Sequence, residues 1–210
     1  MTPIIDIHTH RPDATAALIA VDPREFSPVP GRYYSVGYHP WHGVDQLDEH
    51  DYALLEQCAS HRQVLAIGET GIDRMRGAAV DVQAAAFIRH LQLAARLGKP
   101  VIVHNVRATQ DILNARRRAA LEDVPLVIHG MRGNAHVART LLEAGCYLSY
   151  GARFNPQALE ATPLDRLLIE TDDAPTSILE VAATVARSLG TTASHITQAA
   201  AGNARRLLDD

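Results

Sequence analysis

Short apolar runs recur along the chain, and most are followed by a segment in which apolar residues return at helical spacing. The runs predict eight strands, at residues 4–10, 16–21, 33–38, 64–68, 100–103, 125–128, 146–150 and 167–169. Helices are predicted at residues 47–62, 81–97, 109–121, 134–145, 177–189 and 193–208. This alternation is typical of parallel strands joined by right-handed crossovers. Eight such strands favour an α/β fold, a closed (β/α)8 TIM-type barrel, over an open doubly wound sheet.

The predicted barrel is short. No helix is expected between the first and second strands, so the first βα unit is shortened. The 210 residues lie near the lower end of the roughly 200 to 400 that such barrels span. We see no repeat and no second core, and therefore predict a single barrel domain over residues 1–210.

Composition and net charge limit which partners and which location we expect for this protein. Apolar residues make up 47% and charged residues 21%, and the formal net charge is −4 with acids and bases interspersed. This argues against a broad positively charged surface for binding duplex nucleic acid, although a local pocket could still be basic. Two cysteines, no leader-like start and no membrane-length apolar run predict a cytoplasmic protein. Nothing implies an obligate protein partner.

Histidines and carboxylates follow the predicted strands. His8 and His10 stand two residues apart at the end of the first strand, a spacing that turns both rings to one side. Because catalytic side chains of such barrels sit where strands end, the others are expected to converge with them. They are His39, Glu69, His104, His129 and Asp172. Without His39, the four histidines and two carboxylates suit two divalent ions bridged by a carboxylate better than one ion.

Each of these residues has a simpler interpretation when taken alone. A histidine after a strand is commonly a buried polar residue, Glu69 could begin a helix, and Asp172 could cap one. For six histidines in loops or helices we expect such structural roles: His42, His50, His61, His90, His136 and His195. Asp6 and Asp73 remain open between orienting a ligand and forming a local turn.

The motif order resembles that of the TatD family of metal-dependent hydrolases, within the amidohydrolase-like superfamily. The motifs are His8-Thr9-His10, Gly37-Tyr38-His39-Pro40, Gly68-Glu69-Thr70-Gly71-Ile72-Asp73, Pro100-Val101-Ile102-Val103-His104, His129-Gly130 and Glu170-Thr171-Asp172. The resemblance implies a phosphodiesterase, commonly described as a deoxyribonuclease. It places one ion on His8, His10, Glu69 and Asp172, and a second on Glu69, His104 and His129, with Glu69 bridging.

Three departures from the family pattern bear on the substrate rather than on the metal centre. The first βα unit is short, and the arginine of the family's His-x-Arg is displaced by one place in His104-Asn105-Val106-Arg107. After Asp172 the chain runs through Asp173-Ala174-Pro175-Thr176 into a helix, where the family has a longer loop.

Two bridged ions would generate hydroxide near neutral pH and polarise a phosphoryl oxygen, with Glu69 and Asp172 as the catalytic residues. His39 is a candidate substrate-binding residue. Arg107, Arg132 and Arg153 follow strands and could each clamp a phosphate or lie on the surface. Trp41, the only tryptophan, could stack on a base or pack.

We therefore expect two divalent ions (zinc, magnesium or manganese) and a phosphoester substrate such as single-stranded DNA ends. A metal-dependent hydrolase of a small phosphoester, ester or amide is the alternative. A non-catalytic metal-binding scaffold is a third hypothesis, which the bridging carboxylate disfavours.

Overall fold

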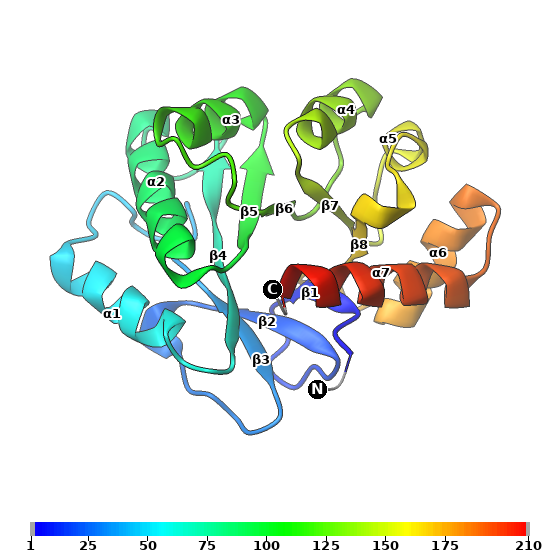
Figure 1. Ribbon diagram of the computed structural model, residues 1–210, viewed down its shortest axis with the longest axis horizontal. Helices are drawn as coiled ribbons and strands as arrows, with labels where there is room; N and C mark the ends of the chain where they lie inside the picture. The colour runs from blue at the N-terminus through cyan, green and yellow to red at the C-terminus, as the bar shows by residue number, and fades with distance from the viewer. Residues whose placement is uncertain (1–2, 209–210) are drawn as a thin grey trace. The chain divides into compact units, whose positions relative to one another are not determined.

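The fold is a closed barrel of eight parallel strands. The computed structural model describes residues 3–208, and the strands are hydrogen-bonded in chain order from β1 to β8 (Figure 1). They are β1 Asp6–Thr9, β2 Ala17–Val21, β3 Tyr33–Val36, β4 Val64–Asp73, β5 Val101–Val106, β6 Leu126–Ile128, β7 Tyr147–Tyr150 and β8 Leu167–Ile169. The predicted (β/α)8 class is confirmed.

Helices follow most of the strands. They are α1 Glu49–Ala59, α2 Val80–Leu97, α3 Thr109–Arg118, α4 Ala135–Glu143, α5 Pro156–Glu160, α6 Ile178–Leu189 and α7 Ala193–Leu208. No helix separates β1 from β2, so the predicted shortening of the first unit is confirmed. Among residues 3–208, no helix combines the length and apolarity needed to cross a membrane.

The chain divides into two compact units. We call Ala20–Leu126 the central unit, and the terminal unit comprises the residues up to Ile19 together with those from Val127 onward. The single domain expected over residues 1–210 stays a prediction.

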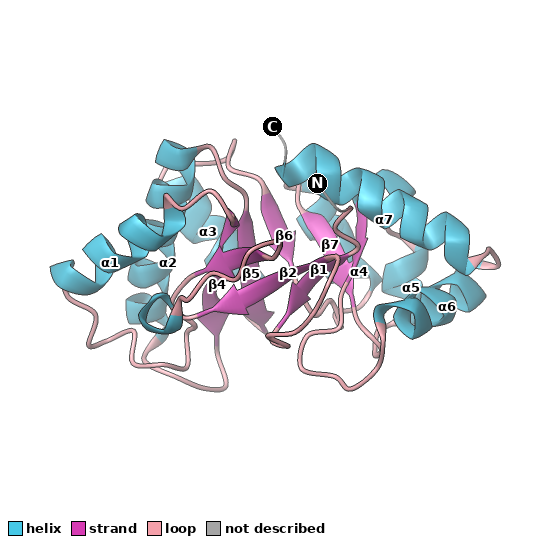
Figure 2. Cartoon of the chain, turned by 90° about the horizontal axis from the view of Figure 1, so that it is seen from below, coloured by secondary structure: helices cyan, strands magenta, loops and turns pink. Residues whose placement is uncertain are grey.

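In the terminal unit, β1 lies between two parallel neighbours. Asp6 pairs with Ala17 of β2 on one side and with Ile169 of β8 on the other. Helices α6 and α7 pack against each other and against β8. Both helices lie outside the strands in Figure 2. This arrangement holds the carboxyl ends of β1 and β8 side by side.

The short helix α5 was not predicted, although its signal is present in the sequence. Asn155 accepts hydrogen bonds from the backbone N–H groups of Gln157 and Ala158, and Pro156 occupies the first helical position. Proline is favoured there because its missing N–H would find no partner within the helix. The helix is only five residues long, too short for hydrophobic periodicity to show.

In the central unit, β4 pairs with β3 and β5, and α2 packs against β4. This strand is longer than predicted, because it continues through the Gly-Glu-Thr-Gly-Ile-Asp motif to Asp73. The predicted strand ended at Gly68. Gly71 has φ of 146°, and a Cβ on it would lie 2.1 Å from the carbonyl oxygen of His104. Glycine is therefore required by the close approach of β5.

Predicted helix ends are confirmed where their chemistry is specific. Gly98 ends α2 in the left-handed conformation, with φ of 62°. Asn134 caps α4 by accepting from the N–H of Val137, and Ser177 caps α6 together with Glu180. These caps fix where each helix begins or ends relative to the strand beside it.

Candidate metal centre

In the terminal unit, backbone hydrogen bonds join His8 and His10 to Asp172. The N–H of Asp172 donates to the carbonyl of His8 at 3.0 Å, and the N–H of His10 donates to the carbonyl of Asp172 at 3.1 Å. Thr9 thereby forms an isolated parallel bridge with Asp172 beyond the end of β8. Asp172 has φ of 54°, a left-handed conformation that a non-glycine residue adopts at some energetic cost.

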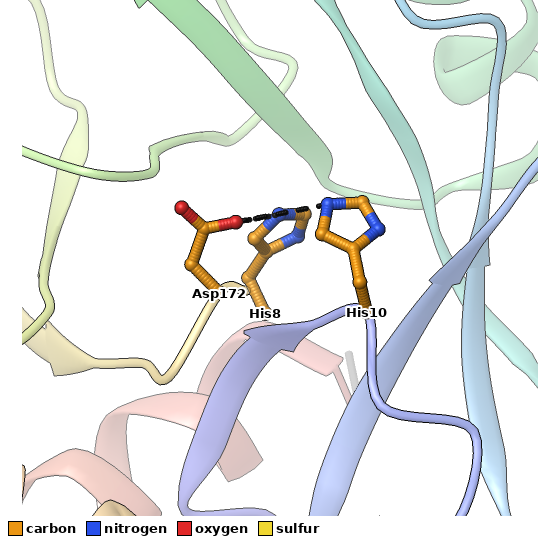
Figure 3. Close-up of side chains that lie close together, drawn as sticks. All are labelled: His8, His10 and Asp172. Carbon is orange, nitrogen blue, oxygen red and sulfur yellow. Dashed lines mark ion pairs between the residues drawn. The ribbon is translucent and has the colours of Figure 1, made fainter. Parts of the chain in front are cut away.

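The side chains of these three residues converge on one point. Asp172 Oδ1 lies 3.7 Å from Nε2 of His8 and 3.7 Å from Nε2 of His10 (Figure 3). Two atoms each about 2.1 Å from one ion at a tetrahedral angle lie roughly 3.4 Å apart, so the spacing fits a divalent ion. His8 is fully buried, whereas the His10 side chain is 45% exposed. An ion bound there would be accessible from solvent on the His10 side.

Asp6, on β1, is hydrogen-bonded to Thr171, the residue before Asp172. Its carboxylate accepts from the N–H of Thr171 at 3.0 Å and from its hydroxyl at 2.6 Å, and Thr171 Oγ1 is also 2.9 Å from Thr9 Oγ1. Burial raises the pKa of Asp6 to about 6, against the opposing effect of these hydrogen bonds. The sequence left Asp6 open between orienting a ligand and forming a local turn. These contacts support the first role, because they hold the ends of β1 and β8, which carry His8, His10 and Asp172.

Glu170 is a buried site residue that the sequence-based ligand sets omitted. Its Oε1 accepts from the N–H of Gly130 at 2.6 Å and lies 3.6 Å from Nδ1 of His129. Its Oε2 is buried and accepts no hydrogen bond from any described residue. His129, Glu170 and Asp172 form a second group whose ligand atoms lie within 4.8 Å of one another. The alternation of Glu170 and Asp172 around Thr171 was the available signal.

In the central unit, Glu69 lies between two histidines. Its Oε1 is 2.7 Å from Nδ1 of His104 and 3.1 Å from Nε2 of His39. Glu69 belongs to β4 and His104 to β5, so both lie inside strands and not at their ends as predicted. The pairing of Gly71 with His104 sets the register that brings them together.

His39, predicted to bind substrate, thus joins this ligand-type cluster. The N–H of Trp41 donates to its Nδ1 at 3.1 Å, which leaves Nε2 facing Glu69. Burial lowers the pKa of His39, with hydrogen bonding and charge at Glu69 acting in the opposite direction. A neutral His39 is therefore favoured, the form that binds a metal ion.

Asp73 supports His104 from the side away from Glu69. Its Oδ2 lies 3.3 Å from Nε2 of His104 and accepts from the indole N–H of Trp41 at 2.7 Å, while Oδ1 accepts from the N–H of Met75. Burial alone would raise the pKa of Asp73, but these hydrogen bonds outweigh it and the pKa is lowered. A carboxylate behind a histidine fixes which ring nitrogen is free for a metal. For Asp73 too, the structure supports the orienting role.

The sequence model of the family described as TatD related DNase matches residues 25–209. The chain belongs to the TatD family. An uncharacterized metal-dependent hydrolase of Bacillus subtilis, YabD, is 32% identical over 177 residues, covering 80% of this chain and 67% of the relative. The human 3'-5' RNA nuclease TATDN2 is 30% identical over 147 residues, covering 65% of this chain and 19% of the relative.

The fold agrees with this family assignment. The crystal structure of YJJV, a TatD homologue of Escherichia coli, superposes with a TM-score of 0.84 at 21% identity, covering 100% of this chain and 99% of that chain. The chain spans little more than half of the length of several other bacterial relatives, 57% and 54% for two of them.

Three arginines of this TatD-family chain were predicted to bind a phosphate. Arg107, Arg132 and Arg153 are all exposed, and their contact with a phosphate stays a prediction.

His90 is structural, as expected. Its Nε2 accepts from the N–H of Tyr38 and its Nδ1–H donates to the carbonyl of Ala86. Burial lowers the pKa of His90 to about 4, so its ring is neutral.

Proposed function

We propose that this chain is a divalent-metal-dependent phosphodiesterase that acts on the ends of single-stranded DNA. The observation that carries the proposal is the pair of histidine–carboxylate clusters, one in each unit, in a TatD-family barrel. Support also comes from the relatives, which include a metal-dependent hydrolase and a 3'-5' RNA nuclease.

Divalent metal ions suit both clusters. Imidazole nitrogens with carboxylate oxygens are the donors of zinc, and manganese and magnesium share the carboxylates. We propose that His8, His10 and Asp172 hold one ion, and that Glu69 and His104 hold another. That Glu69 is shared by both ions and that His129 binds the second stays a prediction from the sequence resemblance. A bound ion supplies acidity toward a water molecule and toward a phosphoryl oxygen.

Within this reaction the protein residues position groups and move protons. Asp172 turns Oδ1 toward the two histidines, so Oδ2 is the oxygen that would accept a proton from the attacking water (Figure 3). Asp6 and Thr171 keep this carboxylate in place from behind. Arg107, Arg132 and Arg153 would pair with phosphate oxygens of the substrate, for which the planar guanidinium is suited.

We propose a cytoplasmic location, in keeping with two buried cysteines that form no disulfide.

A small-molecule hydrolase is the second candidate. The observation in its favour is the short connection after the ligand Asp172, since α6 is capped by Ser177 and begins at Ile178. No extended loop is therefore present there to cover a long substrate. Release of a phosphate or acyl group from a small ester would need no such cover.

A panel of substrates separates the two candidates. The protein, purified without chelator, would be assayed on a bis-aryl phosphodiester, an aryl phosphomonoester and an end-labelled single-stranded oligonucleotide. Glu69→Ala serves as the inactive control. We expect stepwise shortening of the oligonucleotide by the wild-type chain. Hydrolysis of the monoester without any cleavage of the oligonucleotide would remove the nuclease assignment.

The ligand assignment is tested by counting metal. Replacing His8 and His10 together by alanine should remove about one ion per chain, because both belong to the same cluster. His136→Ala is the matched control, since this histidine is exposed on α4. Bound metal is measured by inductively coupled plasma mass spectrometry after dialysis. If the double variant kept its full metal content, the assignment would be wrong.

A further inference from the structure

Trp41 is partly exposed and yet held rigidly. The residue is 40% exposed, but its indole N–H donates to Asp73 Oδ2 at 2.7 Å and its backbone N–H donates to Nδ1 of His39 at 3.1 Å. Asp73 itself is buried. Tryptophans that only fill a core are largely covered, whereas this ring is fixed at its polar edge and open to solvent.

The loop after β4 completes a rigid surface beside this ring. Gln83, buried on α2, donates from Nε2 to the carbonyls of Asp73, Arg76 and Ala78 and accepts from the N–H of Asp73. A Cβ at Gly77 would lie 2.3 Å from the carbonyl oxygen of Pro40, so the loop is packed closely against the residue before Trp41. Both segments are therefore preorganised.

A cation and an apolar side chain project from this loop. The guanidinium carbon of Arg76 lies over one face of the Trp41 ring, 4.7 Å from its centre, and the neighbouring Met75 is 60% exposed. A flat aromatic ring combined with a guanidinium is the chemistry that binds a nucleobase and its adjoining phosphate.

The ring also lies next to the candidate metal ligands of the central unit. Its centre is 4.7 Å from that of His39 and 5.3 Å from that of His104, and Asp73 contacts both His104 and the indole. A ligand bound on this surface would therefore place its neighbouring phosphate close to Glu69 and His104.

We propose that Trp41 and Arg76 form a subsite that stacks a nucleobase of single-stranded nucleic acid. This inference rests on the proposed function and specifies it, because it identifies a base rather than the phosphate chain alone as a recognised group. A base stacks on the indole, and Arg76 neutralises the phosphate attached to that nucleotide.

Fluorescence offers a direct test, because Trp41 is the only tryptophan in the chain. The 210-residue chain in chelator, where hydrolysis is suppressed, would be titrated with short oligothymidylate and with an abasic phosphodiester oligomer of equal length. Stacking predicts quenching by oligothymidylate and at least fivefold tighter binding than that of the abasic chain. Equal binding and equal quenching by the two oligomers would overturn the proposal. A parallel titration with oligouridylate shows whether DNA, RNA or both supply the base.

Variants separate stacking from a merely structural role of the indole. Binding of labelled oligothymidylate, followed by fluorescence anisotropy, should weaken about five- to tenfold in Trp41→Leu and less than twofold in Trp41→Phe, which keeps an aromatic face. Binding of the abasic oligomer should be equal in both variants and in the wild type. If both variants lost oligothymidylate and abasic binding alike, Trp41 would be a structural residue and the proposal would fail.

Failure of this inference is distinguishable from failure of the proposed function. Quenching and base-dependent binding without cleavage in the presence of metal would retain the subsite and reject the nuclease. Metal-dependent cleavage of oligothymidylate and of the abasic oligomer at equal rates, without quenching, would retain the phosphodiesterase and reject the subsite.

Discussion

At the scale of single residues, buried polar side chains divide into those with complete hydrogen bonding and those that need a further partner. His90 and Asp6 have protein partners for their polar atoms. Glu170 does not, because Oε2 accepts no hydrogen bond from any described residue. A buried carboxylate oxygen without a hydrogen-bond donor is costly, and a cation would suit it as a partner. Glu170 therefore differs from His90 and Asp6 in having an oxygen available to a further ligand.

His90 should make the stability of the protein depend on pH. Its folded-state pKa of about 4 lies below the ordinary 6.5, so the unfolded chain binds the proton more readily. The stabilisation is complete above pH 6.5 and is lost as the pH falls toward 4. Urea unfolding should show a loss of about 2 kcal/mol more between pH 7 and pH 5 in the wild type than in His90→Gln. Equal losses in both proteins would contradict this role.

Glu170→Gln should have opposite effects with and without metal. Glutamine can still accept from the N–H of Gly130, but it cannot carry the negative charge beside His129. We expect roughly tenfold weaker metal binding and an unchanged or raised melting temperature of the metal-free protein, because an uncompensated buried charge is removed. Thermal melts over a metal titration measure both. If the variant melted at a lower temperature without metal and bound metal as well as the wild type, Glu170 would serve only to accept the hydrogen bond from Gly130.

At the scale of elements, close contacts between strands determine which side chains meet. Strand β4 approaches β5 at Gly71, opposite His104, and this contact sets Glu69 beside His104. In the terminal unit the hydrogen bonds between His8, His10 and Asp172 have the same effect. The ligands are therefore positioned by backbone pairing, and mutations in the backbone contacts should alter the site.

Gly71→Ala tests this dependence. A methyl group there meets the carbonyl oxygen of His104 in a backbone conformation with φ of 146°, so we expect a loss of about 3 kcal/mol or more in unfolding free energy. Gly98→Ala is the control, since its φ of 62° is also positive but no atom lies within 4 Å of the added methyl group. It should cost about 1 kcal/mol. Similar losses in urea unfolding would show that the strand contact is not critical.

The sequence predicted all eight strands because each is a short apolar run between polar segments. It placed Glu69 and His104 at strand ends, whereas both lie inside longer strands. Glycines in the Gly-Glu-Thr-Gly-Ile-Asp motif lowered the local strand propensity, and only the approach of β5 explains them. The role of Glu170 depends on Gly130, forty residues away in the chain, a contact that sequence spacing does not reveal.

At the scale of the whole molecule, the closed barrel and the family membership agree with the motif order in the sequence. Each compact unit contributes its own histidine–carboxylate cluster: His8, His10 and Asp172 in the terminal unit, and His39, Glu69 and His104 in the central unit. The proposed activity requires metal ions at these clusters, so the metal-free protein should be inactive. Metal dependence is therefore the central claim.

That claim is tested most directly by the rate of bis-aryl phosphodiester hydrolysis as zinc, manganese or magnesium is added to the metal-stripped protein. We predict no hydrolysis above background in chelator, a rate that rises to saturation with one of these ions, and a rate at least about 100-fold lower in Glu69→Ala. Equal activity in the stripped and loaded protein, or full activity in Glu69→Ala, would contradict the account.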